Sequence, residues 1–319
     1  MKVSIIILNW NGGEDNCAEA VASAMAQSYD NKEIVFVDNG STDGSGLAIK
    51  ARYGDLLYVG LPENVGCPPG RNLGAEYANG ELLFFLENDG AWDDVGLVAS
   101  AVELFNKQPL LGAVYTRVEG YATGSLDLPL DPKPAKDTCS GLYLSSSFRG
   151  GASIIRSRLF TDCGGFPSDF FRQAEERFMA LMIYDRGFKV AYWPEYSLRH
   201  KGSDYSGKAA AVASFGVENS LKTNLRLYPV LPGLVIGLSK FMLGMLSLLK
   251  AGLYKESVMV SATLFKELFG RRQYQRVSKD CFCEVETLRQ GLSSSLDVDR
   301  KTDKAAMSVL LFKRFFAGA

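Results

Sequence analysis

Short apolar runs alternate with helix-like segments over the first 120 residues of the chain. Runs rich in Ile, Val, Leu and aromatic residues are typical of strands that are buried on both faces of a parallel sheet. These runs are Val3–Leu8, Ile34–Val37, Leu56–Val59, Leu82–Leu86 and Leu111–Tyr115. Helices are predicted in the segments between these runs, at Cys17–Gln27, Ser45–Tyr53, Gly70–Ala78 and Val95–Asn106. Alternating strands and helices imply right-handed crossovers, so the pattern predicts an α/β fold with a doubly wound, mostly parallel sheet flanked by helices.

The composition of the chain changes twice after the fifth run. Residues 119–147 are rich in Gly, Pro, Ser and Asp, which predicts a long mobile loop. Helices are then expected at Ser157–Cys163 and Glu175–Arg186, followed by a strand at Val190–Trp193. From Pro229 onward helix formers dominate, with many Leu and Met residues, and we place a boundary there.

The overall composition permits a large core and excludes several classes of protein. Of the 319 residues, 47% are hydrophobic and 22% are charged, so wholesale disorder is excluded. The 35 Lys and Arg residues balance 36 Asp and Glu residues, which argues against a dedicated nucleic-acid binder. Six cysteines without a Cys-x-x-Cys pair suggest neither a zinc ribbon nor a disulfide framework, and they favour a reduced, cytoplasmic compartment. The first apolar run ends at Asn9, too early for a signal peptide.

Several common catalytic motifs are missing from the sequence. No Gly-x-Gly-x-x-Gly follows the first run, which disfavours a nicotinamide dehydrogenase, and no P-loop motif is present. There is no Gly-x-Ser-x-Gly motif, and His200 is the only histidine available to a catalytic triad. The candidate chemistry lies instead in acidic residues that follow the apolar runs, where sheets of this kind bind their ligands.

Asp38 ends the second run and opens the sequence VDNGSTDGS. A carboxylate at this place can accept hydrogen bonds from a nucleotide base or from ribose hydroxyl groups. The alternative is a purely structural turn, in which Asp43 or Ser45 lies near the start of the next helix. Both interpretations stay open on these residues alone.

Three further groups of residues suit a metal-binding or catalytic role, and each of the first two also has a purely structural explanation. The string Glu87-Asn88-Asp89 offers oxygen ligands that can hold Mg²⁺ or Mn²⁺ against phosphates, or it is the polar turn that follows a buried strand. The adjacent Glu175 and Glu176 begin a helix, where the helix dipole favours acids, and either carboxylate can serve as a general base. His200 lies in a polar Gly/Ser segment and is a candidate ligand for a metal or a diphosphate.

Taken together, these segments resemble the inverting, nucleotide-sugar-dependent glycosyltransferases of family 2, which have the GT-A fold. The opening VSIIILNWNG and the motif VDNGSTDGS are similar to the family's first two strand-and-turn motifs. A third block matches ENVGCPPGRNLGAEYANGELLFFLENDGAW, in which an Arg-Asn-x-Gly helix leads to the metal-binding strand. The acceptor half resembles FRGGASIIRSRLFTDCGGF and AEERFMALMIYDRGFKVAYWPEYSLRHKGS. The ordered match covers about residues 1–204.

The resemblance implies a role for each candidate residue. Asp38 would contact the nucleotide base or ribose, and the implied nucleotide-sugar site as a whole comprises Asn9, Asp38, Asn39, Asn64, Arg71, Asn88 and Gly151. Asp89 takes the place of the second Asp in the family's Asp-x-Asp motif and would bind Mn²⁺ or Mg²⁺, together with His200. The first acid of that motif is here Glu87, so its direct contact with the metal stays open. Glu176 aligns with the catalytic Asp of the family, and Glu175 aligns with the acid that precedes it.

The resemblance also implies a domain division and a reaction. Residues 1–118 would bind the donor, residues 119–228, including the loop 119–147, would bind the acceptor, and residues 229–319 would form a helical extension. The expected reaction moves a sugar from a nucleoside-diphosphate sugar to a hydroxyl of a saccharide or lipid-linked saccharide, in surface polysaccharide or glycolipid synthesis. Two alternatives stay open: a catalytically degenerate scaffold, and a sugar-phosphate nucleotidyltransferase, whose Arg-bearing glycine loop the segment NWNGGEDN lacks.

The C-terminal hundred residues combine an apolar helix with positive charge. Residues 234–249 are apolar on nearly all sides, but they are fewer than the ~20 that span a bilayer, and Lys240 falls among them. Residues 240–279 carry a local charge of +6, from eight Lys or Arg residues against Glu256 and Glu267. The pattern predicts in-plane attachment to an anionic membrane, at the inner face, and residues 301–319 repeat it. The alternative is that these helices dock on the catalytic domain or form a homodimer.

Overall fold

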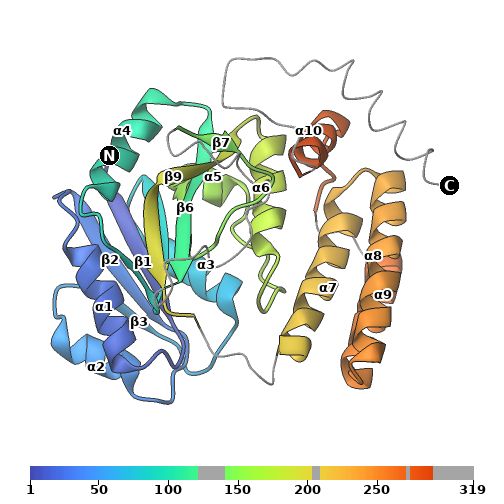
Figure 1. Cartoon of the computed structure of the whole chain (residues 1–319), viewed down its shortest axis with the longest axis horizontal. Helices are drawn as coiled ribbons and strands as arrows, with labels where there is room; N and C mark the ends of the chain where they lie inside the picture. Colours follow the sequence, from blue (N-terminus) through green and yellow to red (C-terminus); the bar gives the residue numbers. More distant parts are fainter. Residues whose placement is uncertain (121–140, 203–208, 271–273, 290–319) are drawn as a thin grey trace.

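A central sheet with helices on both faces forms the body of the protein, and a layer of further helices lies at one side (Figure 1). The computed structural model describes residues 1–120, 141–202, 209–270 and 274–289. Within these ranges the strand order is β3-β2-β1-β4-β8-β6-β9-β5, with β7 beside β9. The expected α/β fold, with a sheet flanked by helices, is confirmed.

Four neighbouring strands near the N-terminus are parallel, as the apolar runs predict. They are β1 (Val3–Asn9), β2 (Lys32–Asp38), β3 (Leu57–Gly60) and β4 (Leu82–Glu87). The connecting helices are α1 (Glu14–Met25), α2 (Ser45–Arg52) and α3 (Cys67–Tyr77). Helix α3 begins three residues before the expected start because Pro68 and Pro69 are tolerated in a first helical turn, where the backbone N–H groups have no partner within the helix.

Beyond β4 the sheet becomes mixed, and this half contains strands that the apolar pattern does not reveal. The elements of this half are β5 (Gly90–Trp92), α4 (Leu97–Lys107), β6 (Leu111–Gly120), β7 (Tyr143–Leu144), β8 (Ala152–Arg156), α5 (Ser157–Asp162), α6 (Glu175–Asp185) and β9 (Lys189–His200). Strand β8 is antiparallel to both β4 and β6, whereas β6 and β9 are parallel. The predicted loop 119–147 is shorter at both ends, because residues 119–120 belong to β6 and residues 143–144 to β7. Residues 121–140 lie outside the described ranges.

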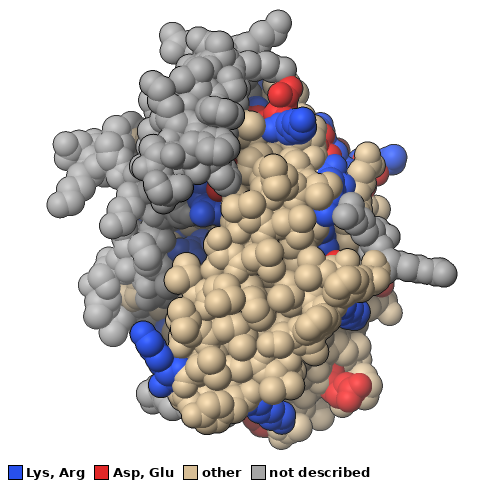
Figure 2. Space-filling view, turned by 90° about the vertical axis from the view of Figure 1, so that its right-hand side faces the viewer, with Lys and Arg blue, Asp and Glu red and all other residues tan. Residues whose placement is uncertain are grey.

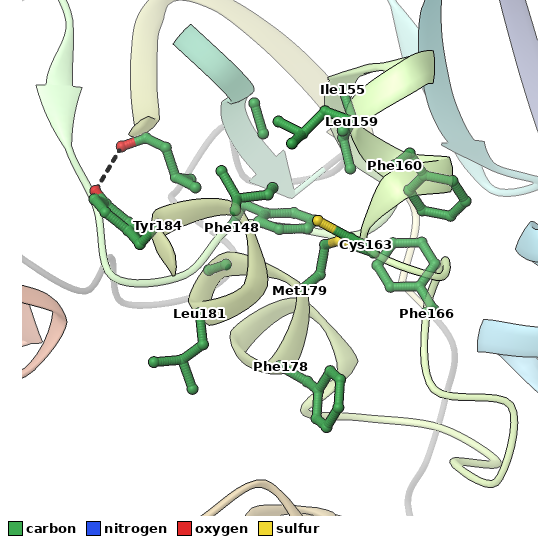
Figure 3. Packing of buried hydrophobic residues seen from close by; sticks show 14 of the residues in the cluster. Phe148, Ile155, Leu159, Phe160, Cys163, Phe166, Phe178, Met179, Leu181 and Tyr184 are labelled. Atoms are coloured by element: carbon green, nitrogen blue, oxygen red, sulfur yellow. Dashed lines mark hydrogen bonds between the residues drawn. The ribbon is translucent and has the colours of Figure 1, made fainter. Parts of the chain in front are cut away.

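Two hydrophobic cores lie on opposite faces of the sheet. Successive residues of β1 alternate between them: Ile5 packs with α1 and α4, whereas Ile6 packs with α5 and α6. Figure 3 shows the second core, in which Phe166 and Phe160 pack beside Met179 of α6. The ring centroids of Phe160 and Phe166 are 5.1 Å apart in an edge-on arrangement. This core holds α6, and with it Glu175 and Glu176, against the sheet.

The helical layer consists of α7 (Ala209–Leu227), α8 (Val230–Lys250), α9 (Tyr254–Phe269) and α10 (Lys279–Arg289). Helix α8 packs closely on α7 through glycines: a Cβ atom at Gly244 would lie 2.4 Å from a methyl group of Val217. Because α7 packs against both α8 and α9, this layer begins upstream of the expected boundary at Pro229. Helix α8 has 21 residues and so is longer than the apolar run in the sequence. Residues 290–319, which include the last basic segment, lie outside the described ranges.

Candidate active site

The functional candidates of β1, β2 and β4 meet at one edge of the sheet. The strands are in parallel register, so that Asn9 is opposite Asp38 and Leu8 is opposite Glu87. Parallel strands end on the same side, and the polar residues that follow them are therefore brought together.

Asn9 is fully buried and links the polar ends of three strands. Its amide nitrogen Nδ2 donates to Asp38 Oδ1 at 3.4 Å and to Ser45 Oγ at 2.9 Å. Its oxygen Oδ1 accepts a hydrogen bond from Asn88 Nδ2 at 2.7 Å. Asn9 thus ties the turn after β2 to the turn after β4, and Asn88 belongs to the same network.

The Asp38 carboxylate is 7% exposed and has hydrogen-bond partners within the protein. The Tyr58 hydroxyl donates to Oδ2 at 2.9 Å, and the backbone N–H of Ser41 donates to Oδ1 at 3.2 Å. Burial and the hydrogen bond to Asp38 raise the pKa of Tyr58 to about 12. Gly46 is required beside the carboxylate, since a Cβ atom there would lie 1.8 Å from Oδ2. The structural role of Asp38 in this turn is therefore evident, and Tyr58 is a partner that the sequence did not indicate.

Asn39 and Asn64 shape the entry to α3. Asn39 Nδ2 donates to Asn64 Oδ1 at 3.0 Å and to the carbonyl oxygen of Gly66 at 3.1 Å. Gly66 has a φ of 99°, a conformation that favours glycine, and it directly precedes the first helical residue. The two asparagines therefore fix the direction in which α3 starts, and with it the position of Arg71 one turn later.

Arg71 lies between two glutamates that come from different parts of the chain. Its Nη2 donates to Glu87 Oε1 at 2.8 Å, and its Nη1 donates to Glu175 Oε1 at 2.9 Å. The guanidinium is 2% exposed and its planar shape allows it to bind two carboxylates at once. The part of Arg71 in the nucleotide site, which the resemblance implies, stays a prediction; the structure joins its guanidinium to Glu87 and Glu175.

Glu87, Asp89 and His200 form the candidate metal site, with ligand atoms that all lie within 4.8 Å of one another. His200 Nε2 is 3.4 Å from Asp89 Oδ1 and 3.5 Å from Glu87 Oε2. Neighbouring ligands of one octahedral ion, each about 2.1 Å from the metal, lie about 3 Å apart, so this spacing is close to what one ion requires. Two carboxylates and one imidazole are also ligands that suit Mn²⁺.

The position and charge of this group depend on tertiary contacts. His200 is the last residue of β9, paired with Gly90 of β5, and so lies in a strand and not in the loop that the sequence suggested. Burial acts to raise the pKa of Glu87, but the hydrogen bond from His200 and the charge of Arg71 prevail and lower it to about 2. Glu87 is therefore ionised and contributes negative charge to the site.

The two adjacent glutamates at the start of α6 lie in different environments. Glu175 is 2% exposed, and its second oxygen, Oε2, has no hydrogen-bond partner among the described residues. Burial and the charge of Glu176 raise the pKa of Glu175 to about 8, although Arg71 opposes this shift. Glu176 is half-buried, and its Oε1 accepts a hydrogen bond from the backbone N–H of Gly150 at 3.2 Å.

Gly150 and Gly151 connect the glutamate pair to the candidate metal site. A Cβ atom at Gly150 would lie 2.3 Å from Arg71 Nη1 and 2.9 Å from Glu176 Oε1. A Cβ atom at Gly151 would lie 2.4 Å from the Cγ of Glu87. The backbone of this pair therefore passes directly against both acidic groups. Sequence reasoning named Gly151 but missed Gly150, although the Gly-Gly pair before β8 was a visible signal.

Asn219 of α7 supports the segment that precedes the glutamate pair. Gln173 and Ala174 both have left-handed backbone conformations, with φ values of 68° and 65°. Asn219 Nδ2 donates to the carbonyl oxygens of Arg172 and Gln173, each at 2.9 Å. No sequence signal marked Asn219, because it lies more than forty residues from its partners.

Comparison with known proteins relates the chain to a described family. Residues 4–160 match the family described as glycosyl transferase family 2. An uncharacterized glycosyltransferase of Rickettsia felis is 41% identical over 88 residues, which are 27% of this chain and 14% of that protein. The O-antigen chain rhamnosyltransferase WbaN of Salmonella anatum is 23% identical over 213 residues, covering 62% of this chain and 65% of that protein. The chain thus spans less than two thirds of the length of these relatives.

Among solved structures, the mannosyltransferase PcManGT of Pyrobaculum calidifontis, in complex with GDP-Man and Mn²⁺, has a similar fold. Its TM-score is 0.56 at 19% identity, and the match covers 100% of this chain and 88% of that one. At this identity the likeness concerns the fold. Residues 4–160 thus belong to a glycosyl transferase family 2 region. The mixed sheet and this likeness show that the chain has the GT-A fold.

Proposed function

We propose that this chain is an inverting, divalent-metal-dependent glycosyltransferase. It would move a sugar from a nucleoside-diphosphate sugar to a hydroxyl of a saccharide or lipid-linked saccharide, in surface polysaccharide or glycolipid synthesis. The observation that carries the proposal is the link between the glutamate pair, Glu175 and Glu176, and the candidate metal site. Arg71 makes this link from Glu175 to Glu87, and Gly150 and Gly151 pass against both groups. We place the activity in the cytoplasm, the compartment that the unpaired cysteine pattern favours.

The donor would lie at the ends of β1, β2 and β4. Asp38 would bind the base or ribose within a turn that Asn9 and Asn39 hold in place. Asp89 and His200, with Glu87, would hold Mn²⁺ or Mg²⁺, which neutralises the charge of the departing diphosphate when bound. The remaining donor candidates, Asn64, Asn88 and Gly151, would act by shaping the pocket, since each contacts a residue of this group.

Glu176 would act as the general base. Its carboxylate is half-buried, and Oε1 accepts a hydrogen bond from Gly150, so that the other oxygen, Oε2, can face an acceptor. It would remove the proton of the acceptor hydroxyl as that oxygen bonds to the anomeric carbon, on the face opposite the departing diphosphate. One displacement of this kind inverts the configuration. Glu175 would hold Arg71 in position, because its carboxylate lies inside the protein.

Thermal stabilisation by nucleoside diphosphates tests the proposal. UDP, dTDP and GDP are each added with and without Mn²⁺ to the wild-type protein, to Asp89→Ala, and to Asp55→Ala, an exposed acid that serves as the matched control. We expect stabilisation by one diphosphate that requires Mn²⁺, that persists in Asp55→Ala and that is lost in Asp89→Ala. No stabilisation by any diphosphate would favour the degenerate scaffold, and pyrophosphate release from a nucleoside triphosphate would favour the nucleotidyltransferase.

A further inference from the structure

Helices α8 and α9 carry most of the exposed large apolar side chains of the described chain, 14 of 23. We call the surface that they form the outer face of α8 and α9. Its members are Val230, Leu231, Val235, Leu238, Met242, Leu243, Leu246, Leu249, Tyr254, Val258, Met259, Phe265, Leu268 and Phe269. Figure 2 shows this side of the molecule as a broad, nearly uncharged surface. An apolar surface of this extent on a soluble domain marks an interaction site.

Each helix presents one side to the protein and the other to its surroundings. On α8 the residues Gly233, Gly237 and Gly244 face α7, and the apolar side chains project on the opposite side. Leu231 and Leu243 are 72% and 66% exposed. Leu248 is buried and Ile236 packs against the core, but burial does not explain the exposed apolar residues of α8, because the contact with α7 is made largely by glycines.

Positive charge lies beside this apolar surface. Lys250, Lys255 and Lys266 are exposed on the same two helices. Glu267 is only 10% exposed, because it pairs with Arg226 at 2.6 Å. Figure 2 shows Lys and Arg side chains around the edge of the apolar area, with few acidic ones. The surface thus combines protruding apolar side chains with a basic border.

We propose that the outer face of α8 and α9 binds the surface of an anionic lipid bilayer, with both helices in the plane of the membrane. The apolar side chains would enter the boundary between headgroups and acyl chains, and the lysines would lie at the level of the lipid phosphates. The bilayer would then lie against the helical layer. Within this layer, α7 contacts the segment that precedes the glutamate pair.

A transmembrane orientation of α8 fits the contacts less well. With 21 residues, the helix is long and apolar enough to cross a bilayer. However, its glycine side packs on α7, whose Lys222 and Arg226 form ion pairs with Asp169. Crossing the membrane would either break this contact or bring those charges close to lipid, at considerable cost.

A second copy of the chain is a less suitable partner than an anionic bilayer. A twofold dimer through this surface would place two basic borders against each other, since the same residues occur on both sides of such an interface. Like charges disfavour such a contact, whereas anionic lipids complement it.

Vesicle co-sedimentation of the full chain tests the proposal. Neutral phosphatidylcholine vesicles are compared with vesicles that also contain phosphatidylglycerol. The double variant Leu243→Gln/Val258→Gln alters the outer face, and Leu47→Gln/Val95→Gln alters comparably exposed apolar residues elsewhere. We expect binding to anionic vesicles that falls at least tenfold in the first variant and is unchanged in the second. Lys255→Gln/Lys266→Gln should weaken that binding about fivefold per lysine.

Four results would overturn the proposal. The wild-type chain could ignore both kinds of vesicle, or the Leu243/Val258 variant could bind like the wild type. A wild-type dimer in sedimentation velocity that the same variant dissociates, without vesicle binding, would assign the face to a second copy. Resistance of the bound protein to carbonate extraction would indicate a transmembrane α8. These measurements need no donor or acceptor, so their outcome is independent of the proposed transferase activity.

Discussion

Asn219 donates a hydrogen bond to the carbonyl oxygen of Gln173, and so connects the helical layer to the segment that precedes the glutamate pair. The bond is 2.9 Å long, and the Asn219 side chain is almost entirely buried. Left-handed conformations at residues other than glycine cost free energy and persist where their surroundings hold them. We infer that Asn219 is what holds Gln173 and Ala174, and thereby sets the start of α6.

Replacing Asn219 tests this relationship. Asn219→Ala should lower the free energy of unfolding by ~1–3 kcal/mol, because the carbonyl groups of Arg172 and Gln173 lose the donor that the buried Asn219 side chain supplies. It should also lower kcat more than it raises the donor KM, since the base moves while the nucleotide turn does not. Denaturant unfolding and nucleoside diphosphate release measure the two effects. Ser220→Ala, one residue further along α7, should change neither the free energy of unfolding nor kcat. Effects equal to those of Asn219→Ala would mean that any substitution in α7 merely destabilises the helix.

Removing the proposed general base should separate chemistry from binding. Glu176→Gln keeps the size of the side chain but cannot accept a proton, so turnover should fall by about 10²–10⁴. Stabilisation by the diphosphate and Mn²⁺ should persist, because Glu176 is not among the proposed metal ligands. Glu175→Gln keeps a hydrogen-bond acceptor for Arg71 and should cost less activity. Normal turnover in Glu176→Gln with loss in Glu175→Gln would assign the base to Glu175.

A single methyl group at Gly150 should disturb the site. The added Cβ atom would lie 2.3 Å from Arg71 Nη1, so the guanidinium, which is buried and has little room, must move. We expect Gly150→Ala to reduce turnover at least tenfold, measured as nucleoside diphosphate release. Gly54→Ala is the matched control, because a Cβ atom there meets no atom within 4 Å. Similar losses in both variants would show that the effect is not specific to Arg71.

The buried carboxyl of Glu175 should make stability depend on pH. Burial and the charge of Glu176 raise its pKa to about 8, so the folded protein binds this proton more tightly than the unfolded chain, whose glutamates titrate near 4.5. Stability from this group is therefore present below about pH 4.5 and is lost as the pH rises toward 8. Over this range, the free energy of unfolding of wild type should fall relative to that of Glu175→Gln.

Urea unfolding at several pH values between 5 and 8.5 measures this difference. Glu103→Gln is the control, because Glu103 is exposed and forms only a surface ion pair with Lys107. The difference in free energy of unfolding between Glu103→Gln and wild type should vary little over the same pH range. If the difference in free energy of unfolding between wild type and Glu175→Gln stays constant with pH, the pKa of Glu175 is not raised.

The parallel half of the fold could be predicted because its signals are local. Strands β1, β2 and β4 are apolar runs, and each is buried on both faces, so the pattern needed no knowledge of distant residues. Strand β5 has three residues, and β7 has two. Such short strands exist only because β9 offers them a partner, more than forty residues further along the chain. Pairing of this kind leaves no periodic signal in the sequence.

The candidate site, too, could be predicted from the sequence only in part. The resemblance to the family, the parallel strands and the acidic residues at their ends could be predicted, because motif order and hydrophobic runs are properties of neighbouring positions. Three relationships could not be predicted: Arg71 joins Glu87 to Glu175, His200 lies 3.4 Å from Asp89, and the apolar side of α8 faces outward. These relationships depend on contacts between distant segments, and such contacts exist only once the cores have packed.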